Sequence, residues 1–163
     1  MKKQNQKINK FAFTLLEIIA VLVIISIAAL IAIPMFSSAS ETQLRAAANM
    51  IAADLEYARS MAISKQKTYK VVFDETNESY TVEDAGSVIS HPVIIGKDYE
   101  IKFSDDSRVN QVDIVEVDFN SSLQVEFNYL GSPDSGGTVR LAARSSTMTI
   151  TVEAVTGFIT ISE

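Results

Sequence analysis

The chain has 163 residues, no cysteine and a formal net charge of −6 at pH 7. Its length leaves room for one domain beside a leader segment, and the lack of cysteine excludes a disulfide scaffold. The first 12 residues hold 4 of the 14 basic groups and no acid, so the remainder carries 10 basic against 20 acidic groups. A domain with this balance repels phosphate backbones, and nucleic acid is not an expected partner.

An apolar stretch follows the N-terminal lysines. From Phe13 to Phe36 it contains one charged residue, Glu17. Residues 18–36 would form a helix about 29 Å long, which matches a bilayer core of about 30 Å. No lysine follows before Lys65, so the positive-inside rule predicts a cytoplasmic N-terminus and an extracytoplasmic remainder.

Glu17 needs a partner in such a stretch, because an ionised acid in hydrocarbon costs on the order of 3 kcal/mol or more. Three interpretations compete for residues 1–40. A secretory signal peptide would be cut near residues 38–40, but the apolar run exceeds the roughly 7–15 residues of such peptides. An uncleaved signal anchor leaves Glu17 unexplained. The third interpretation pairs the acid with a processed N-terminus.

The residues Ala12-Phe13-Thr14-Leu15-Leu16-Glu17 resemble the signature of type IV prepilins and pseudopilins. In that family a short basic leader ends in glycine, followed by Phe-Thr-Leu-hydrophobic-Glu and a long apolar helix. The resemblance implies that a prepilin peptidase removes residues 1–12 by cutting between Ala12 and Phe13, and that the new amine of Phe13 is methylated. Ala12 departs from the usual glycine.

The same resemblance gives Glu17 a role in assembly. Cleavage before Phe13 creates an ammonium group four residues ahead of the carboxylate, and opposite charges attract strongly in a layer of low dielectric. A helix entering a fibre could set its Glu17 against the Phe13 amine of a neighbour. Glu17 also suits the positive N-terminal end of its own helix. Pro34, where the family commonly has a proline, predicts a bend.

Helical periodicity continues beyond the apolar run. Apolar residues recur there at steps of three and four: Leu44, Ala48, Ile51, Leu55, Ala58 and Ala62. Polar residues occupy the other faces: Arg45, Asn49, Asp54, Glu56 and Arg59. The sequence predicts one long helix over 13–64, transmembrane over about 18–36 and amphipathic over about 41–64.

Residues 65–163 are predicted to form an extracytoplasmic β-domain. Short, alternating segments rich in β-branched residues predict eight strands: 67–73, 79–83, 99–103, 112–119, 123–129, 138–143, 147–153 and 157–161. Alternation implies sheets with one buried face. The expected fold is α+β and type IV pilin-like, with a long helix packed on a small antiparallel sandwich or curled sheet.

The order of helix and β-domain narrows the resemblance to the H-type minor pseudopilins and related minor pilins, the GspH/FimT group. The matching residues lie at the helix end and near the C-terminus: Leu55, Ala58, Arg59, Ala62, Ile63, then 127–131, 138–141 and 150–157. The resemblance implies a minor pseudopilin of the type II secretion pseudopilus, held in the inner membrane with a periplasmic β-domain. Its implied partners are other pseudopilins or pilins, the prepilin peptidase and an inner-membrane assembly platform.

Two alternatives stay open. One is a minor pilin of a type IV pilus, acting in adhesion, twitching or DNA uptake. The other is a signal-anchored envelope binding domain unrelated to fibres. For DNA, the final glycine of relatives is often followed by arginine, whereas Gly157 is followed by Phe158. The basic groups elsewhere are expected to lie on solvated faces: Arg140 and Arg144, and Lys65, Lys67 and Lys70.

No residue pattern indicates an enzyme. The chain lacks a cysteine nucleophile and a G-x-S-x-G elbow, and its one histidine, His91, precedes Pro92 in a predicted loop, where a structural role is expected. Acids at 105–106 and at Asp134 have oxygen ligands that would suit calcium. Neither follows the spacing of a calcium loop, so no metal or cofactor is expected.

Overall fold

The computed structural model describes the backbone of residues 14–163 and the side chains of residues 14–29 and 40–163. Ala12 and Phe13, the predicted processing site, lie outside the described residues, and so does the side chain of Pro34. Cleavage, methylation and the bend therefore stay predictions. The chain divides into two compact units, Met1–Ser37 and Ser38–Glu163.

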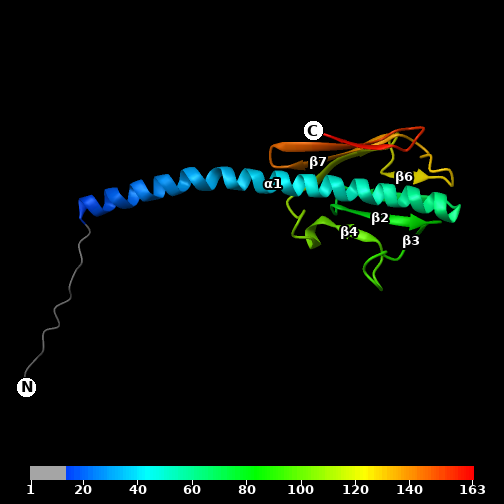
Figure 1. Ribbon diagram of the computed structural model, residues 1–163, viewed down its shortest axis with the longest axis horizontal. Helices are drawn as coiled ribbons and strands as arrows, with labels where there is room; N and C mark the ends of the chain where they lie inside the picture. The colour runs from blue at the N-terminus through cyan, green and yellow to red at the C-terminus, as the bar shows by residue number, and fades with distance from the viewer. Residues whose placement is uncertain (1–13) are drawn as a thin grey trace, which may run out of the picture. The chain divides into compact units, whose positions relative to one another are not determined.

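One helix, α1, spans Leu15–Lys65 (Figure 1), within two residues of both predicted ends. The hydroxyl of Thr14 accepts a hydrogen bond from the backbone N–H of Glu17 at 3.2 Å and so caps the helix N-terminus. At the other end Gln66 takes a left-handed φ of 55°. The N–H of Lys67 then donates to the carbonyl of Ala62, which ends the helix in the usual left-handed turn.

In the first unit, the described part of α1 exposes its large apolar side chains in every direction. They are Leu15, Leu16, Ile18, Ile19, Val21, Leu22, Val23, Ile24, Ile25 and Ile27. Within the part of the chain that the structure describes, no helical stretch combines the length and apolarity needed to cross a membrane.

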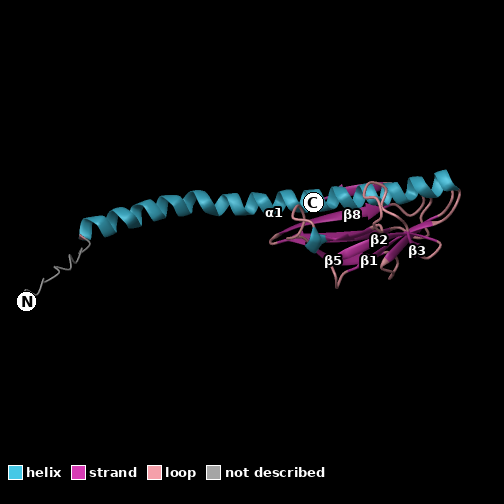
Figure 2. Ribbon diagram, turned by 90° about the horizontal axis from the view of Figure 1, so that it is seen from below, coloured by secondary structure: helices cyan, strands magenta, loops and turns pink. Residues whose placement is uncertain are grey.

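The second unit contains two antiparallel sheets, coloured magenta in Figure 2. The first has the order β3-β2-β1-β6, with β4 also paired to β2. Its strands are β1 (Tyr69–Asp74), β2 (Ser79–Asp84), β3 (Ser87–Val88), β4 (Glu100–Lys102) and β6 (Gln124–Phe127). The second has the order β5-β7-β8-β9. Its strands are β5 (Asp113–Asp118), β7 (Gly137–Ala143), β8 (Ser146–Val152) and β9 (Ile159–Ser162).

Each of the eight predicted segments contains or overlaps one of these strands. The strand that the sequence did not predict, β3, has two residues and is too short to show an alternating pattern. A 3₁₀ turn, η1 (Phe103–Asp105), follows β4 directly. The expectation of a long helix and an antiparallel β-domain is confirmed.

The core of the second unit lies between α1 and both sheets. Every residue of the predicted apolar stripe, from Leu44 to Ala62, is buried, and Ala47 is buried beside them. They share one core with inward-facing residues of the first sheet such as Val71, and of the second such as Leu141. The rings of Phe73 and Phe119 stack with their centroids 6.1 Å apart, which adds to the packing of the core.

Two carboxylates of the β1–β2 turn tie the sheets together. Glu75 accepts a hydrogen bond from the backbone N–H of Val117 at 2.7 Å, and Glu78 accepts one from that of Ile114. Both N–H groups belong to β5, the edge strand of the second sheet. The turn therefore covers part of an edge that would otherwise be open to further strand pairing.

Candidate assembly surface

The residue singled out for assembly, Glu17, lies in the first turn of α1 with its side chain exposed. Among the described residues it forms no ion pair within 4.0 Å. Its expected partner, the amine of Phe13, lies outside them. The role of Glu17 in assembly therefore stays a prediction.

Near the C-terminal end of α1, three of the residues that carried the narrower resemblance lie beside Arg59: Ile63, Gly131 and Gly157. The Nε of Arg59 donates to the carbonyl of Gly131 at 3.1 Å, and its Nη1 lies 3.4 Å from a carboxylate oxygen of Glu56. Gly131 follows β6, so this bond fixes the loop after β6 to the helix. The spacing noted in the sequence thus corresponds to a physical junction between the helix and the strands.

Two glycines are required at this junction. Gly131 and Gly157 have φ values of +80° and +63°, which disfavour any residue with a Cβ. A Cβ on Gly131 would lie 2.7 Å from the Cδ1 of Ile63, and one on Gly157 would lie 2.8 Å from the carbonyl oxygen of Gly131. The turn between β8 and β9 therefore packs its backbone directly on the loop after β6.

Exposed apolar side chains surround this junction. They come from the end of α1, the loop after β6 and the turn between β8 and β9: Ile63, Tyr129, Leu130, Val155 and Phe158. We call these five residues the end surface. The two loops are joined by a hydrogen bond from the Ser132 hydroxyl to the Val155 carbonyl, and Figure 1 shows both near the C-terminal end of α1. Exposed apolar clusters of this kind mark contact sites for other proteins.

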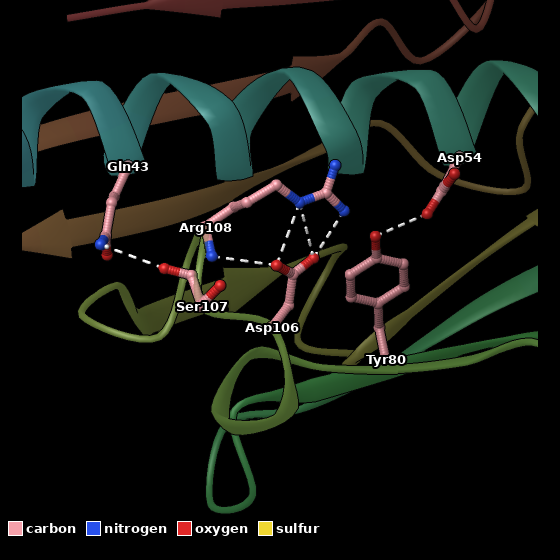
Figure 3. Close-up of polar contacts among 6 residues, drawn as sticks. All are labelled: Gln43, Asp54, Tyr80, Asp106, Ser107 and Arg108. Atoms are coloured by element: carbon pink, nitrogen blue, oxygen red, sulfur yellow. Dashed lines mark hydrogen bonds and ion pairs between the residues drawn. The ribbon is translucent and has the colours of Figure 1, made fainter.

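A second junction holds the first sheet against the middle of α1. The carboxylate of Asp54 accepts hydrogen bonds from the hydroxyl of Tyr80 at 2.6 Å and from that of Tyr99 at 2.8 Å; Figure 3 draws the bond to Tyr80. Burial raises the pKa of Asp54, against the opposing effect of the two hydroxyls and of His91. Burial and the neighbouring carboxylate raise the pKa of Tyr80 and of Tyr99. The hydroxyls therefore remain protonated donors.

A third contact fixes the loop between η1 and β5. The Oε1 of Gln43 on α1 accepts from the backbone N–H of Gln111 at 3.1 Å, and its Nε2 donates to the Ser107 carbonyl at 3.4 Å. In the same loop Arg108 makes a fork of bonds to Asp106, the shortest 2.6 Å (Figure 3). These bonds lower the pKa of the Asp106 carboxyl. The loop is thus ordered by its own ion pair and by the helix.

Asp134, which was weighed as an oxygen ligand for calcium, contacts the backbone of its own domain. Asp134 accepts from the backbone N–H of Glu126 at 3.0 Å. Within the described residues no three acidic or histidine side chains gather as they would around a metal ion. Several of the basic groups that were weighed for phosphate binding face acids. These pairs are Lys67–Asp84, Lys70–Glu83 and Arg140–Glu116.

Sequence reasoning placed Asp54 on a face of the helix away from the apolar stripe and did not foresee its contacts with Tyr80 and Tyr99. Its spacing contained a signal, because Asp54 is three residues after Ile51 and four before Ala58 and so borders the apolar stripe. A second signal came from Tyr80 and Tyr99, which occupy inward positions, because a buried phenol hydroxyl needs a hydrogen-bond partner.

Comparison with known proteins agrees with this geometry. The model of the family described as Type II transport protein GspH matches residues 47–156. No curated protein matches the sequence. The Pseudomonas aeruginosa (strain PAO1) type IV minor pilin FimU has a similar structure in two crystal forms. One has a TM-score of 0.55 and 15% identity over 76% of this chain and 90% of that chain; the other has 0.52 and 16% over 74% and 93%.

The minor pseudopilin EpsH from the type 2 secretion system of Vibrio cholerae is similar as well, with a TM-score of 0.55 and 10% identity over 73% of this chain and 95% of that chain. Identities this low show a shared fold, whereas the family model covers more than half of the sequence. The proteins matched are structural subunits rather than enzymes. The chain therefore belongs to the GspH family and is a minor pseudopilin or minor pilin with a type IV pilin-like fold.

Proposed function

We propose that this protein is a minor pseudopilin of a type II secretion system, a non-catalytic subunit of the short fibre that supports protein export. The family description, Type II transport protein, favours secretion over piliation. The observation that carries the proposal is the exposed apolar surface of α1 between Leu15 and Ile27. Exposing this much apolar area is unfavourable in water, so this half of the helix needs a bilayer or neighbouring helices around it.

In this proposal the chain is first held in the inner membrane by residues 18–36, with the N-terminus cytoplasmic and the β-domain periplasmic. The apolar run and the preceding lysines of the sequence support that orientation. A prepilin peptidase then cuts before Phe13, the new amine is methylated, and an assembly platform moves the helix from lipid into the fibre. Glu17 joins the Phe13 amine of a neighbour, which removes two costly charges from the apolar layer together.

The end surface supports a second contact, made by the β-domain. It is apolar, and the loop after β6 that carries part of it is bonded to α1 through Arg59. A subunit with an apolar helical segment and a separate exposed apolar surface on its β-domain can contact neighbours through both.

A minor pilin of a type IV pilus is the second candidate, and the likeness to FimU favours it. The two candidates differ in the neighbours that the chain meets. DNA uptake within that second candidate receives no support from the end surface, because Phe158 occupies the position after Gly157 and several basic groups of the β-domain are paired with acids.

In-cell crosslinking from the end surface tests the proposal. Since the chain contains no cysteine, Val155→Cys carries a photoreactive maleimide at one defined position, and mass spectrometry identifies what it captures. Pseudopilins of a secretion system are the expected products. Capture of a major pilin or of pilus-tip proteins would assign the chain to a pilus instead. Failure to recover the chain with any fibre would contradict both candidates.

A further inference from the structure

One histidine organises the loop between β3 and β4. The Nδ1 of His91 accepts hydrogen bonds from the backbone N–H groups of Val93 and Ile94, both at 3.1 Å. The N–H of His91 donates to the Lys97 carbonyl at 2.8 Å and closes residues 91–97 at their base. We call these residues the 91–97 loop. The turn at Val93 and Ile94 thus depends on a single acceptor atom.

The same two hydrogen bonds fix the position of the proton on the neutral imidazole. A ring nitrogen that accepts N–H bonds carries a free lone pair, so neutral His91 holds its proton on Nε2. A second proton can be added only at Nδ1, where it converts the acceptor into a donor. The N–H groups of Val93 and Ile94 would then face another N–H. The turn and the protonated form of His91 therefore exclude one another.

The surroundings of His91 favour a positive charge on its ring. The imidazole packs against the ring of Tyr99 with the centroids 4.6 Å apart, and the Tyr99 hydroxyl donates to the carboxylate of Asp54 on α1. Burial raises the pKa of Asp54, and the charge of His91 opposes that rise. The two groups attract when both are charged, so protonation gains a contact with α1 while the loop loses its acceptor.

The remaining charged groups near His91 lie along a groove of about 610 Å³ that this histidine and Asp54 line together. Two ion pairs border it: Lys102 is 3.1 Å from Glu100, and Arg108 pairs with Asp106. Lys97, Asp98 and Asp105 line it as well. With Asp54 included, acids outnumber bases along the groove by five to three. An added positive charge on His91 is therefore compensated at this groove rather than repelled.

We propose that His91 is a pH-sensitive switch that holds the 91–97 loop in its turn when neutral and releases it when protonated. Histidine is the side chain whose charge ordinarily changes between about pH 5 and 8, and this is the only one in the sequence. The loop carries three exposed apolar side chains, Val93, Ile94 and Ile95, so pH decides whether they are presented in one fixed shape. The switch needs neither a membrane nor a fibre and does not rest on the proposed function.

The β1–β2 turn supplies a matched control within the same chain. The Oδ1 of Asp74 accepts from the N–H groups of Thr76 and Asn77 at 2.9 and 3.0 Å, which are the residues two and three positions ahead, as in the 91–97 loop. Hydrogen bonds from the Asn77 side chain and from the backbone lower the pKa of Asp74. This carboxylate keeps its lone pairs over the range in which a histidine titrates, so its turn should not respond.

Nuclear magnetic resonance of the full-length chain in detergent tests the switch. At about pH 7.5 the imidazole nitrogen signals should place the proton of His91 on Nε2. Between about pH 7.5 and about pH 5, the hydrogen-exchange protection factors of Val93 and Ile94 should fall at least about tenfold, because both N–H groups lose their acceptor together. Those of Thr76 and Asn77 should stay constant.

Three results would overturn the inference. They are a proton on Nδ1 at neutral pH, protection of Val93 and Ile94 that does not change with pH, and an equal fall at Thr76 and Asn77, which would mean that the whole domain loosens in acid.

Two variants of His91 separate the switch from a general effect of pH. His91→Asn should keep Val93 and Ile94 protected at both pH values, since an Asn oxygen accepts from the residues two and three positions ahead and does not titrate. His91→Ala removes the acceptor and should leave both N–H groups unprotected at both pH values. If the protection of Val93 and Ile94 in His91→Asn still falls in acid as it does in the wild type, His91 is not the switch.

Discussion

The two halves of α1 form one continuous helix, but their apolar side chains differ in exposure. Between Leu15 and Ile27 the large apolar side chains are exposed in all directions, whereas between Leu44 and Ala62 a single stripe is buried under two sheets. An amphipathic half is stabilised by its own domain. A half that is apolar all round needs surroundings from outside the chain. The difference separates the residues that fold the β-domain from those for which we propose a role in assembly.

The largest expected loss of stability comes from a substitution in the buried half of α1. Leu55→Ala should lower the free energy of unfolding by about 2–5 kcal/mol, because it leaves a cavity in a fully buried site. Leu22→Ala, the same change in the exposed half, should leave unfolding of the β-domain unchanged. Thermal unfolding of both full-length variants in detergent measures this. Equal shifts would mean that the two halves do not differ as described.

A smaller effect is expected at the junction that fixes the end surface to α1. Gly157→Ala combines a left-handed φ with a Cβ only 2.8 Å from a carbonyl oxygen, so it should cost more than the roughly 1–2 kcal/mol of backbone strain alone. Gly86→Ala is the control, because Gly86 has a φ of +84° but nothing within 4 Å of the added Cβ. Denaturant midpoints should fall in the order wild type, Gly86→Ala, Gly157→Ala. If the denaturant midpoint falls less for Gly157→Ala than for Gly86→Ala, the turn between β8 and β9 is not packed as closely as described.

The smallest expected effects are changes in the pH dependence of stability, which arise from two carboxyl groups, Asp54 on α1 and Asp106 in the loop before β5. Because the pKa of Asp54 is raised in the folded state, its carboxyl adds stability below its ordinary pKa, and this contribution is lost as the pH rises through the raised value. Asp106 has a lowered pKa, so its contribution is present above the ordinary pKa and is lost as the pH falls through the lowered value.

Urea unfolding followed as a function of pH distinguishes these two carboxylates. Asp54→Asn should reduce the loss of stability on going from acid towards neutral pH, and Asp106→Asn should reduce the loss on going to strongly acid pH. The second change should be the smaller, since the Arg108 partner is mostly exposed. A pH profile unchanged by Asp54→Asn would mean that this carboxyl titrates alike in folded and unfolded chains.

The regular elements were predictable because they depend on local periodicity. The apolar stripe from Leu44 to Ala62 determined both the helix and the face it buries, and alternation marked strands as short as β4. The junctions were less predictable, since they join residues far apart in the chain. Arg59 and Gly131 were noticed through spacing, but their hydrogen bond was not foreseen. The contacts of Asp54 were not foreseen, because its tyrosine partners lie 26 and 45 residues away.

The exposure of the loop at residues 91–97 was not predicted, for a related reason. His91 before Pro92 was expected to have a structural role, and the structure shows which one, an acceptor for two N–H groups of its own loop. Three apolar residues in succession give no sign of whether they are buried or exposed until the strands around them are placed. Here they follow the short β3, and the fold leaves them in solvent.

The central claim is that the exposed half of α1 enters a fibre through Glu17. The most direct test measures the fraction of Glu17→Ala in sheared fibres, with Glu41→Ala as a control, because Glu41 is another exposed acid of the same helix. Both variants should insert into the membrane normally. Glu17→Ala should fall at least about tenfold in the fibre, since the neighbour's amine loses its counter-charge in an apolar layer. Glu41→Ala should stay at the wild-type level. Incorporation of Glu17→Ala at the wild-type level would contradict the account.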